Sequence, residues 1–153
     1  PATSGNAKAA ISSANQAKVP LVSPSATGDD VTVDRDGKVQ PYGYRLCFKD
    51  SFQGQVMAKF ASENLKSTKA MIIADNSNDY GTALAKEFTS HFTGTVVGQE
   101  SYTGAEKDFS AIITNIKNKD FDVLVIPGYY GQAGLIIKQG ISKEQAKFAI
   151  TRQ

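Results

Sequence analysis

Three short segments of the sequence carry side chains that could bind a small polar molecule. Residues 23–27 include Ser25, Ala26 and Thr27, residues 75–80 are polar and end at Tyr80, and residues 127–131 place Tyr129 and Tyr130 between glycines. Hydroxyl and amide donors suit a carboxylate, which accepts several hydrogen bonds at once. Tyrosine rings suit the wall of a pocket, because they join an apolar face to a polar hydroxyl. The chemistry that these residues predict is binding.

Each segment also has an ordinary structural explanation. An ordinary Ser/Thr turn accounts for residues 23–27, and that segment by itself favours the turn. Asn78 or Asp79 can cap a helix that starts near Tyr80, which explains the polar residues without a ligand. Packing at the surface explains Tyr129 and Tyr130 about as well as a pocket does.

The sequence lacks the common signatures of catalysis, cofactor binding and metal binding. It contains no Gly-x-Gly-x-x-Gly, no phosphate-binding loop, no His-Glu-x-x-His and no Gly-x-Ser-x-Gly. His91, the one histidine, falls at the predicted end of a helix, where interaction with the helix dipole is the simpler role. Cys47, the one cysteine, is expected to be a small core residue of a strand. We therefore predict no enzyme, no cofactor and no metal, and a small α/β enzyme with an unrecognised site is the weakest alternative.

Composition excludes other classes of protein. The chain has 153 residues, of which 41% are hydrophobic, so it can bury one core. Lys and Arg number 17 against 15 Asp and Glu, and the basic residues are spread along the chain, which argues against nucleic acid as a partner. No apolar run approaches the roughly 20 residues of a membrane span, and no signal segment is present in the chain.

Short apolar runs alternate with segments of helical period, which is typical of parallel α/β proteins. The pattern predicts a three-layer αβα architecture around a central, mainly parallel sheet. Strands are expected at residues 20–23, 44–48, 69–74, 95–100, 122–126 and 147–151. Helices are expected at residues 4–17, with Ser4 as N-cap, and at residues 51–65, 80–92 and 108–116. The inward faces are expected to carry Val56, Phe60, Ala61 and Leu65 in the second of these helices, and Leu84, Phe88 and Phe92 in the third. Because ligands of open parallel sheets lie beyond the carboxyl ends of the strands, the three polar segments are where a site is expected.

A polar, turn-rich stretch at residues 28–43 is the best domain boundary in the chain. Residues 1–43 then form the remnant of a first lobe with its connection to a hinge. Residues 44–153 form most of a second α/β lobe, which we expect to be incomplete at its C-terminal end. The abrupt start at Pro1 looks like the middle of a longer protein.

Residues 19–27, 44–54, 75–81, 105–110 and 127–131 resemble the branched-chain (Leu/Ile/Val) amino-acid binding proteins of ABC transporters, which have the type I periplasmic binding protein fold. The resemblance spans the chain to about residue 139. It implies a two-lobed extracytoplasmic receptor that captures a free amino acid and delivers it to a membrane permease. The alternative is a ligand-sensing domain of the same fold, coupled to a signalling partner.

The resemblance also implies roles for individual residues. The backbone carbonyl of Ser25 would accept the ammonium group of the ligand, and Thr27 would give its hydroxyl and amide to the carboxylate. Ser4, or its neighbour Thr3, would be a further hydroxyl donor. Tyr80 and Tyr129 would be walls from the opposite lobe, and Tyr130 is the alternative to Tyr129.

The sequence departs from the family pattern near its end. The family places an acidic partner for the ammonium after the next strand, where this chain has Arg152 and no acid. Different specificity, a local misalignment in residues 140–147 and truncation are the three explanations, of which we prefer truncation. Half a pocket is expected to bind ligand weakly or not at all. Open sheet edges also predict self-association of the fragment. The identity of the amino acid is left open.

Overall fold

The computed structural model describes residues 1–34, 36–140 and 148–150. Contacts divide the chain into two compact units, Pro1–Gln53 and Gly54–Gln153. Each unit has its own hydrophobic core. Residues 44–53, which were expected in the second lobe, pack with the first unit, because residues 43–45 pair with residues 21–23.

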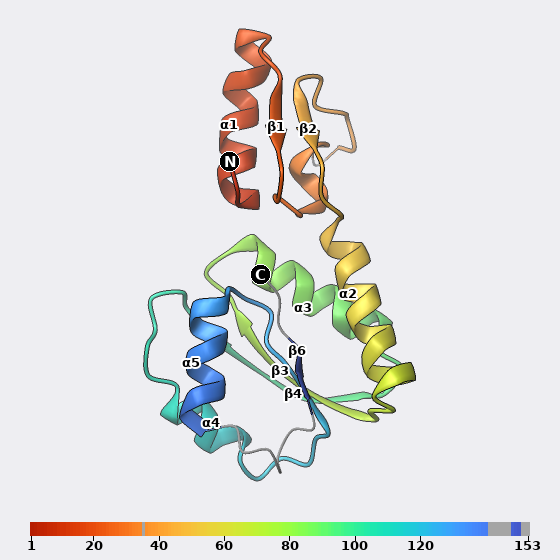
Figure 1. Cartoon of the computed structure of the whole chain (residues 1–153), viewed down its shortest axis with the longest axis vertical. Helices are drawn as coiled ribbons and strands as arrows, with labels where there is room; N and C mark the ends of the chain where they lie inside the picture. Colours follow the sequence, from red (N-terminus) through yellow and green to blue (C-terminus); the bar gives the residue numbers. More distant parts are fainter. Residues whose placement is uncertain (35, 141–147, 151–153) are drawn as a thin grey trace. The chain divides into compact units, whose positions relative to one another are not determined.

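The first unit is one helix, two short parallel strands and a helical turn (Figure 1). They are α1 (Ser4–Ala17), β1 (Leu21–Ser23), η1 (Asp29–Val31) and β2 (Gly43–Arg45). In the pairing, Val22 lies opposite Tyr44, and both side chains are exposed. The small core consists of Ala7, Ile11, Ala26 and Val31, with Leu21 packed against it.

The second unit is built on a parallel sheet in the order β4-β3-β5-β6. Its strands are β3 (Lys69–Asp75), β4 (Thr95–Tyr102), β5 (Val123–Val125) and β6 (Phe148–Ile150). Its helices are α2 (Asp50–Lys59), α3 (Asp79–His91), α4 (Ser110–Ile116) and α5 (Tyr130–Gly140). Helix α2 begins in the first unit and continues as the π-helical turn η2 (Phe60–Asn64).

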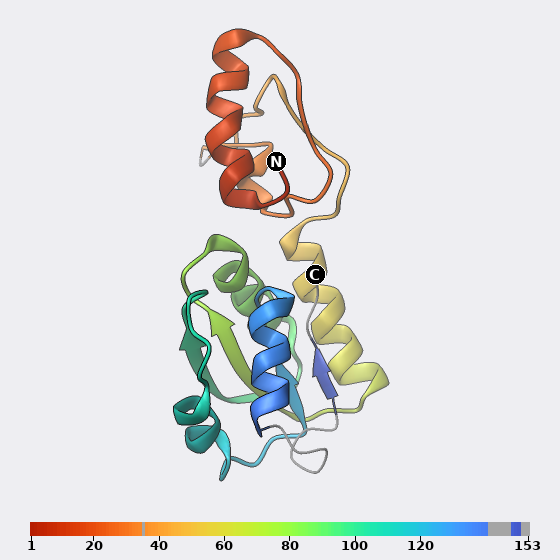
Figure 2. The same ribbon diagram turned by 60° about the vertical axis from the view of Figure 1, so that its left-hand side comes forward.

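Helices cover both faces of this sheet (Figures 1 and 2). Along β3, Ile72 faces the core that α2 and α3 complete, whereas Met71 and Ile73 face the core that α4 and α5 complete. Because successive residues of a strand point to opposite faces, a strand buried on both sides reads as one continuous apolar run. The predicted three-layer α/β fold with a parallel sheet is confirmed.

Several local predictions are confirmed. The helix at residues 4–17 has the expected bounds, and the apolar residues of α3, Leu84, Phe88 and Phe92, are buried. Asn78 is the N-cap of α3, and its side chain accepts the Gly81 N–H at 2.9 Å. His91 is the last residue of that helix, as expected.

Other local predictions are wrong. The N-cap of α1 is Thr3, so Ser4 is already a helical residue. Of the four residues expected on the inward face of the helix at residues 51–65, Ala61 is buried and Leu65 packs against the core, but Val56 and Phe60 are exposed. Met57 and Ala58 are buried in their place. Cys47 lies beyond the end of β2 and is only half-buried. The predicted ends of the last strand, residues 147 and 151, and Arg152 lie outside the described residues.

Candidate functional site

The loop after β1 is folded by its own hydroxyl groups. Ser23 is fully buried, and its hydroxyl donates to the Pro1 carbonyl at 2.7 Å while accepting the Ala26 N–H at 3.1 Å. The Ser25 hydroxyl donates to the Ala2 carbonyl at 2.8 Å. These bonds hold residues 23–26 against the residues that precede α1. The turn explanation and the binding explanation of this loop are therefore compatible.

The first turn of α1 lies beside the same loop. The Ser4 hydroxyl accepts the Gly28 N–H at 2.9 Å, and both Ser4 and Thr27 are buried. Thr3 caps α1 without a side-chain hydrogen bond, and the first turn contains no acidic residue. Free N–H groups and the helix dipole make such a terminus favourable for an anion. The structure thus gathers Ser4, Ser25, Ala26 and Thr27 around one helix start.

Asp50 and Arg45 hold Thr27 from the other side. The Asp50 N–H donates to the Thr27 carbonyl at 2.9 Å, and the Arg45 guanidinium donates to the same carbonyl at 3.2 Å and to that of Gly28 at 2.7 Å. The Asp50 side chain is buried and is hydrogen-bonded to the Thr27 side chain. The pKa of Asp50 is raised to about 6, mainly by burial and in smaller part by Asp29, although the Thr27 bond and Arg45 act to lower it.

The second unit contains the predicted tyrosines. The rings of Tyr80, in the first turn of α3, and Tyr129, directly before α5, stack with centroids 5.7 Å apart and planes inclined by 17°. Tyr80 is almost fully buried and Tyr129 is half-buried. Tyr130 is the first residue of α5, and its side chain is 76% exposed. Of the two adjacent tyrosines, Tyr129 is the one that lies with Tyr80.

Close backbone approaches fix the loops that carry these rings. A Cβ atom at position 81 would overlap the Asp75 carbonyl oxygen, and one at position 128 would overlap the Tyr102 hydroxyl. Only glycine therefore allows α3 to start so near the end of β3, and the Tyr129 loop to pass so near the end of β4.

The carboxylate of Asp75 links two of these loops. It is buried at the end of β3 and accepts the Ser77 N–H at 2.9 Å and the Ser77 hydroxyl at 2.6 Å. The Ser77 hydroxyl in turn accepts the Gly104 N–H at 3.0 Å, and the Gln132 amide donates to the Gly104 carbonyl at 2.7 Å. A chain of hydrogen bonds thus joins the ends of β3 and β4 to α5.

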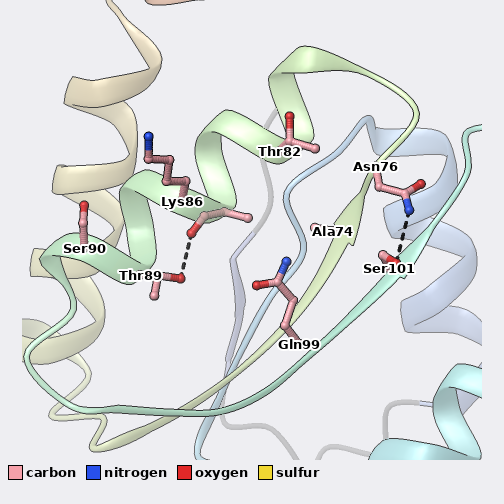
Figure 3. A pocket seen from close by; sticks show the side chains of 9 residues that line it. Ala74, Asn76, Thr82, Lys86, Thr89, Ser90, Gln99 and Ser101 are labelled. Atoms are coloured by element: carbon pink, nitrogen blue, oxygen red, sulfur yellow. Dashed lines mark hydrogen bonds between the residues drawn. The ribbon is translucent and has the colours of Figure 1, made fainter.

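A separate groove lies at the edge of the sheet between α3 and β4 (Figure 3). Its volume is about 460 Å³, and small and polar side chains line it, among them Asn76, Lys86 and Gln99. The Asn76 amide spans its end and donates to the Ser101 hydroxyl at 3.3 Å. Neither Tyr80 nor Tyr129 lines this groove, so it is distinct from the stacked pair.

Within the described part of the chain, no three His, Cys, Asp or Glu side chains gather where they could hold a metal ion. None of the helices described there is long and apolar enough to cross a membrane.

Four residues near the start of α1 and near the stacked tyrosines were not predicted from the sequence: Arg45, Asp50, Asp75 and Tyr102. Arg45 and Asp50 act through a carbonyl and a hydroxyl more than 15 residues away in the chain, so no local pattern marks them. For Asp75 a signal existed, because a carboxylate that directly follows a buried strand lies at the edge where ligands of parallel sheets bind.

Comparison with known proteins places this geometry in a family. The family model described as periplasmic binding protein matches residues 1–146. The Leu/Ile/Val-binding protein homolog 3 of Brucella melitensis is 34% identical over 78% of the chain, and the Leu/Ile/Val-binding protein BraC3 of Rhizobium johnstonii is 33% identical over 91%. The chain spans 32% and 37% of these two relatives, respectively.

A solved structure agrees with the sequence comparisons. The branched-chain amino-acid transporter substrate-binding protein LivJ of Streptococcus pneumoniae, solved with isoleucine, superimposes with a TM-score of 0.84 at 43% identity. The match covers 91% of this chain and 38% of that one. The chain therefore belongs to the periplasmic binding protein family and has its type I fold.

Proposed function

We propose that this chain is part of an extracytoplasmic substrate-binding protein that captures a free amino acid and delivers it to the permease of an ABC transporter. The observation that carries the proposal is the start of α1, where the N-cap Thr3 makes no side-chain hydrogen bond, Ser4 and Thr27 lie close by, and the first turn has no acidic residue. This arrangement offers positive electrostatic potential and hydrogen-bond donors to one small carboxylate.

In this proposal Thr27 donates its hydroxyl and backbone N–H to the ligand carboxylate, and Ser4 is a further hydroxyl donor. The Ser25 carbonyl accepts from the ammonium group. Its position is supported by the hydrogen bonds that fix the loop, since both Ser23 and Ser25 are tied to the residues before α1. A rigid loop loses little entropy when the ligand binds, which favours affinity.

The stacked Tyr80 and Tyr129 would bury the side chain of the ligand. Their rings are held by packing and by the glycine approaches at positions 81 and 128, so the wall exists before ligand arrives. Two relatives are named for binding leucine, isoleucine and valine, and the similar solved structure contains isoleucine. A branched-chain amino acid is therefore the ligand class that we propose.

Capture would require a hinged closure of two lobes, with contacts to the ligand that form only when both lobes touch it. The work would be binding, with no bond made or broken. The predicted self-association of the fragment stays a prediction, because the structure describes a single chain.

The test is calorimetric titration of leucine, isoleucine, valine, glutamate and phenylalanine into the full-length protein. We expect saturable binding of the branched-chain amino acids, weakened at least tenfold by Thr27→Ala and by Tyr129→Ala. The matched control is Tyr130→Ala, which removes an exposed ring next to Tyr129 and should leave affinity unchanged. A full-length protein that binds none of the amino acids would overturn the proposal.

A further inference from the structure

The carboxyl group of Asp50 is in direct contact with Thr27, a proposed ligand donor. Its side chain is 1% exposed, and its backbone N–H and its carboxyl both contact Thr27. The carboxyl oxygen Oδ1 has no hydrogen-bond partner among the described residues. A buried carboxylate with one oxygen unpaired is costly, and that cost falls when the group takes up a proton.

The hydroxyl of Thr27 has a single proton to give. An ionised carboxylate only accepts hydrogen bonds, so while Asp50 is ionised the Thr27 hydroxyl must donate to it. The same proton cannot then reach the carboxylate of an amino acid. A protonated Asp50 can instead donate to the Thr27 oxygen, which releases the hydroxyl proton for the ligand.

We propose that Asp50 is a positioning residue for ligand binding, and that it must be protonated for Thr27 to donate its hydroxyl to the ligand carboxylate. The inference rests on the proposed role of Thr27. Wherever Asp50 is ionised in the free protein, binding of the amino acid then requires uptake of a proton by the protein.

The surroundings of Asp50 place this proton exchange near neutral pH. The pKa of Asp50 is raised to about 6, mainly by burial and also by the neighbouring Asp29 and Asp30 of η1, although the Thr27 bond and Arg45 of β2 act to lower it. Asp30 is itself paired with Lys8 of α1 at 2.9 Å, and Asp29 accepts from the Ser51 N–H and hydroxyl. Lys49, the preceding residue, is exposed.

The direction of the pH effect follows from these charges. A ligand carboxylate beside Thr27 adds negative charge, so it raises the pKa of Asp50 further in the complex. At pH values between the pKa of Asp50 in the free protein and its pKa in the complex, the complex carries one proton more than the free protein and the free ligand together. The apparent Kd therefore increases as pH rises above about 6, by at most tenfold per pH unit. The carboxyl and ammonium groups of the ligand keep their charges from pH 5 to pH 8.

The experiment is calorimetry of isoleucine binding to the full-length protein at pH 7.5, in two buffers of different ionisation enthalpy. The difference in apparent enthalpy counts the protons taken up, and we expect most of one proton per ligand. Kd is measured in parallel from pH 5 to pH 8. In Asp50→Asn the amide can donate permanently to Thr27, so we expect no uptake and a flat pH profile.

Asp36→Asn is the matched control, since it removes an exposed carboxyl of the same unit and should keep the wild-type uptake and profile. Saturable binding without proton uptake would overturn the role of Asp50 and leave the proposed function intact. Absence of binding at every pH would overturn both. Uptake that persists unchanged in Asp50→Asn would assign the proton to another group and contradict this inference.

Discussion

The rings of Tyr80 and Tyr129 stack although 49 positions of sequence separate them. Tyr80 lies in the first turn of α3 and Tyr129 directly before α5, beyond the carboxyl ends of the adjacent strands β3 and β5. Parallel pairing of these strands, with Ala70 opposite Val123, brings their ends to the same edge of the sheet. The pair is thus a product of the strand order. Each ring stabilises the other before any ligand is present.

Because the two rings stack, we expect the effects of their removal on the free energy of unfolding to be coupled. Tyr80→Ala should lower the free energy of unfolding by about 3–5 kcal/mol, since the ring is almost fully buried, and Tyr129→Ala should cost less because its ring is half-buried. The double variant should cost less than the sum, by about 0.5–1.5 kcal/mol. Urea unfolding of the four full-length proteins measures this coupling. Strict additivity would mean that the rings do not interact.

The start of α3 predicts a strong effect of one added methyl group. Gly81→Ala should destabilise the protein by more than about 2 kcal/mol, because the new Cβ overlaps the Asp75 carbonyl and neither backbone segment can move freely. Gly134→Ala in α5 is the control. No atom lies within 4 Å of that Cβ, and alanine favours a helix, so its thermal midpoint should rise or stay equal. Equal losses from both variants would contradict the close approach.

The close approach of Gly128 to the Tyr102 hydroxyl predicts that one substitution can restore the stability that another removes. Gly128→Ala should destabilise the protein, since its Cβ overlaps the Tyr102 hydroxyl, and Tyr102→Phe should restore most of the loss by removing that oxygen. Tyr102→Phe alone should be neutral or stabilising, because the buried hydroxyl has no hydrogen-bond partner among the described residues. Burial, followed by the nearby Asp75, also raises the pKa of Tyr102, so the group stays neutral. Thermal unfolding of the three variants is the measurement, and a double variant no more stable than Gly128→Ala would exclude the overlap.

Asp50 predicts a pH dependence of stability in the absence of ligand. Its pKa in the folded protein, about 6, lies above the ordinary value of 3.8, so folding favours the protonated form. Its contribution is fully present below pH 4 and is lost as pH rises through 6, which costs at most about 3 kcal/mol. Asp50→Asn removes the titration. Its stability relative to wild type should therefore increase between pH 4 and pH 7, as measured by urea unfolding at each pH. A constant difference would show that Asp50 does not titrate in this window.

The sequence predicted the strands of the second unit well. Residues 70–74 and 123–126 are apolar without interruption, which is typical of strands that are buried on both faces of a sheet. Helix α3 was equally clear, because its cap at Asn78 and its buried Leu84 and Phe88 are encoded within one segment. The loops that follow these strands could therefore be named in advance as the place of a site.

The inward face of α2 was not predictable in the same way. Val56 and Phe60 repeat at four-residue spacing and satisfy the helical pattern, yet the side that approaches α3 is the one that carries Gly54 and Ala58. Close packing of two helices selects small residues for the contact, and apolar periodicity does not measure size.

By itself, the sequence determined the fold class and the alternation of parallel strands and helices. It also determined the segments after the strands in which Ser25, Thr27, Tyr80 and Tyr129 lie. Local periodicity and local motifs are enough to predict all of these features. Only the tertiary structure decided that Tyr129 rather than Tyr130 stacks on Tyr80, and that Asp50 reaches Thr27. Those choices depend on contacts between residues far apart in the chain, whose geometry is set by strand pairing and by the packing of helices on the sheet.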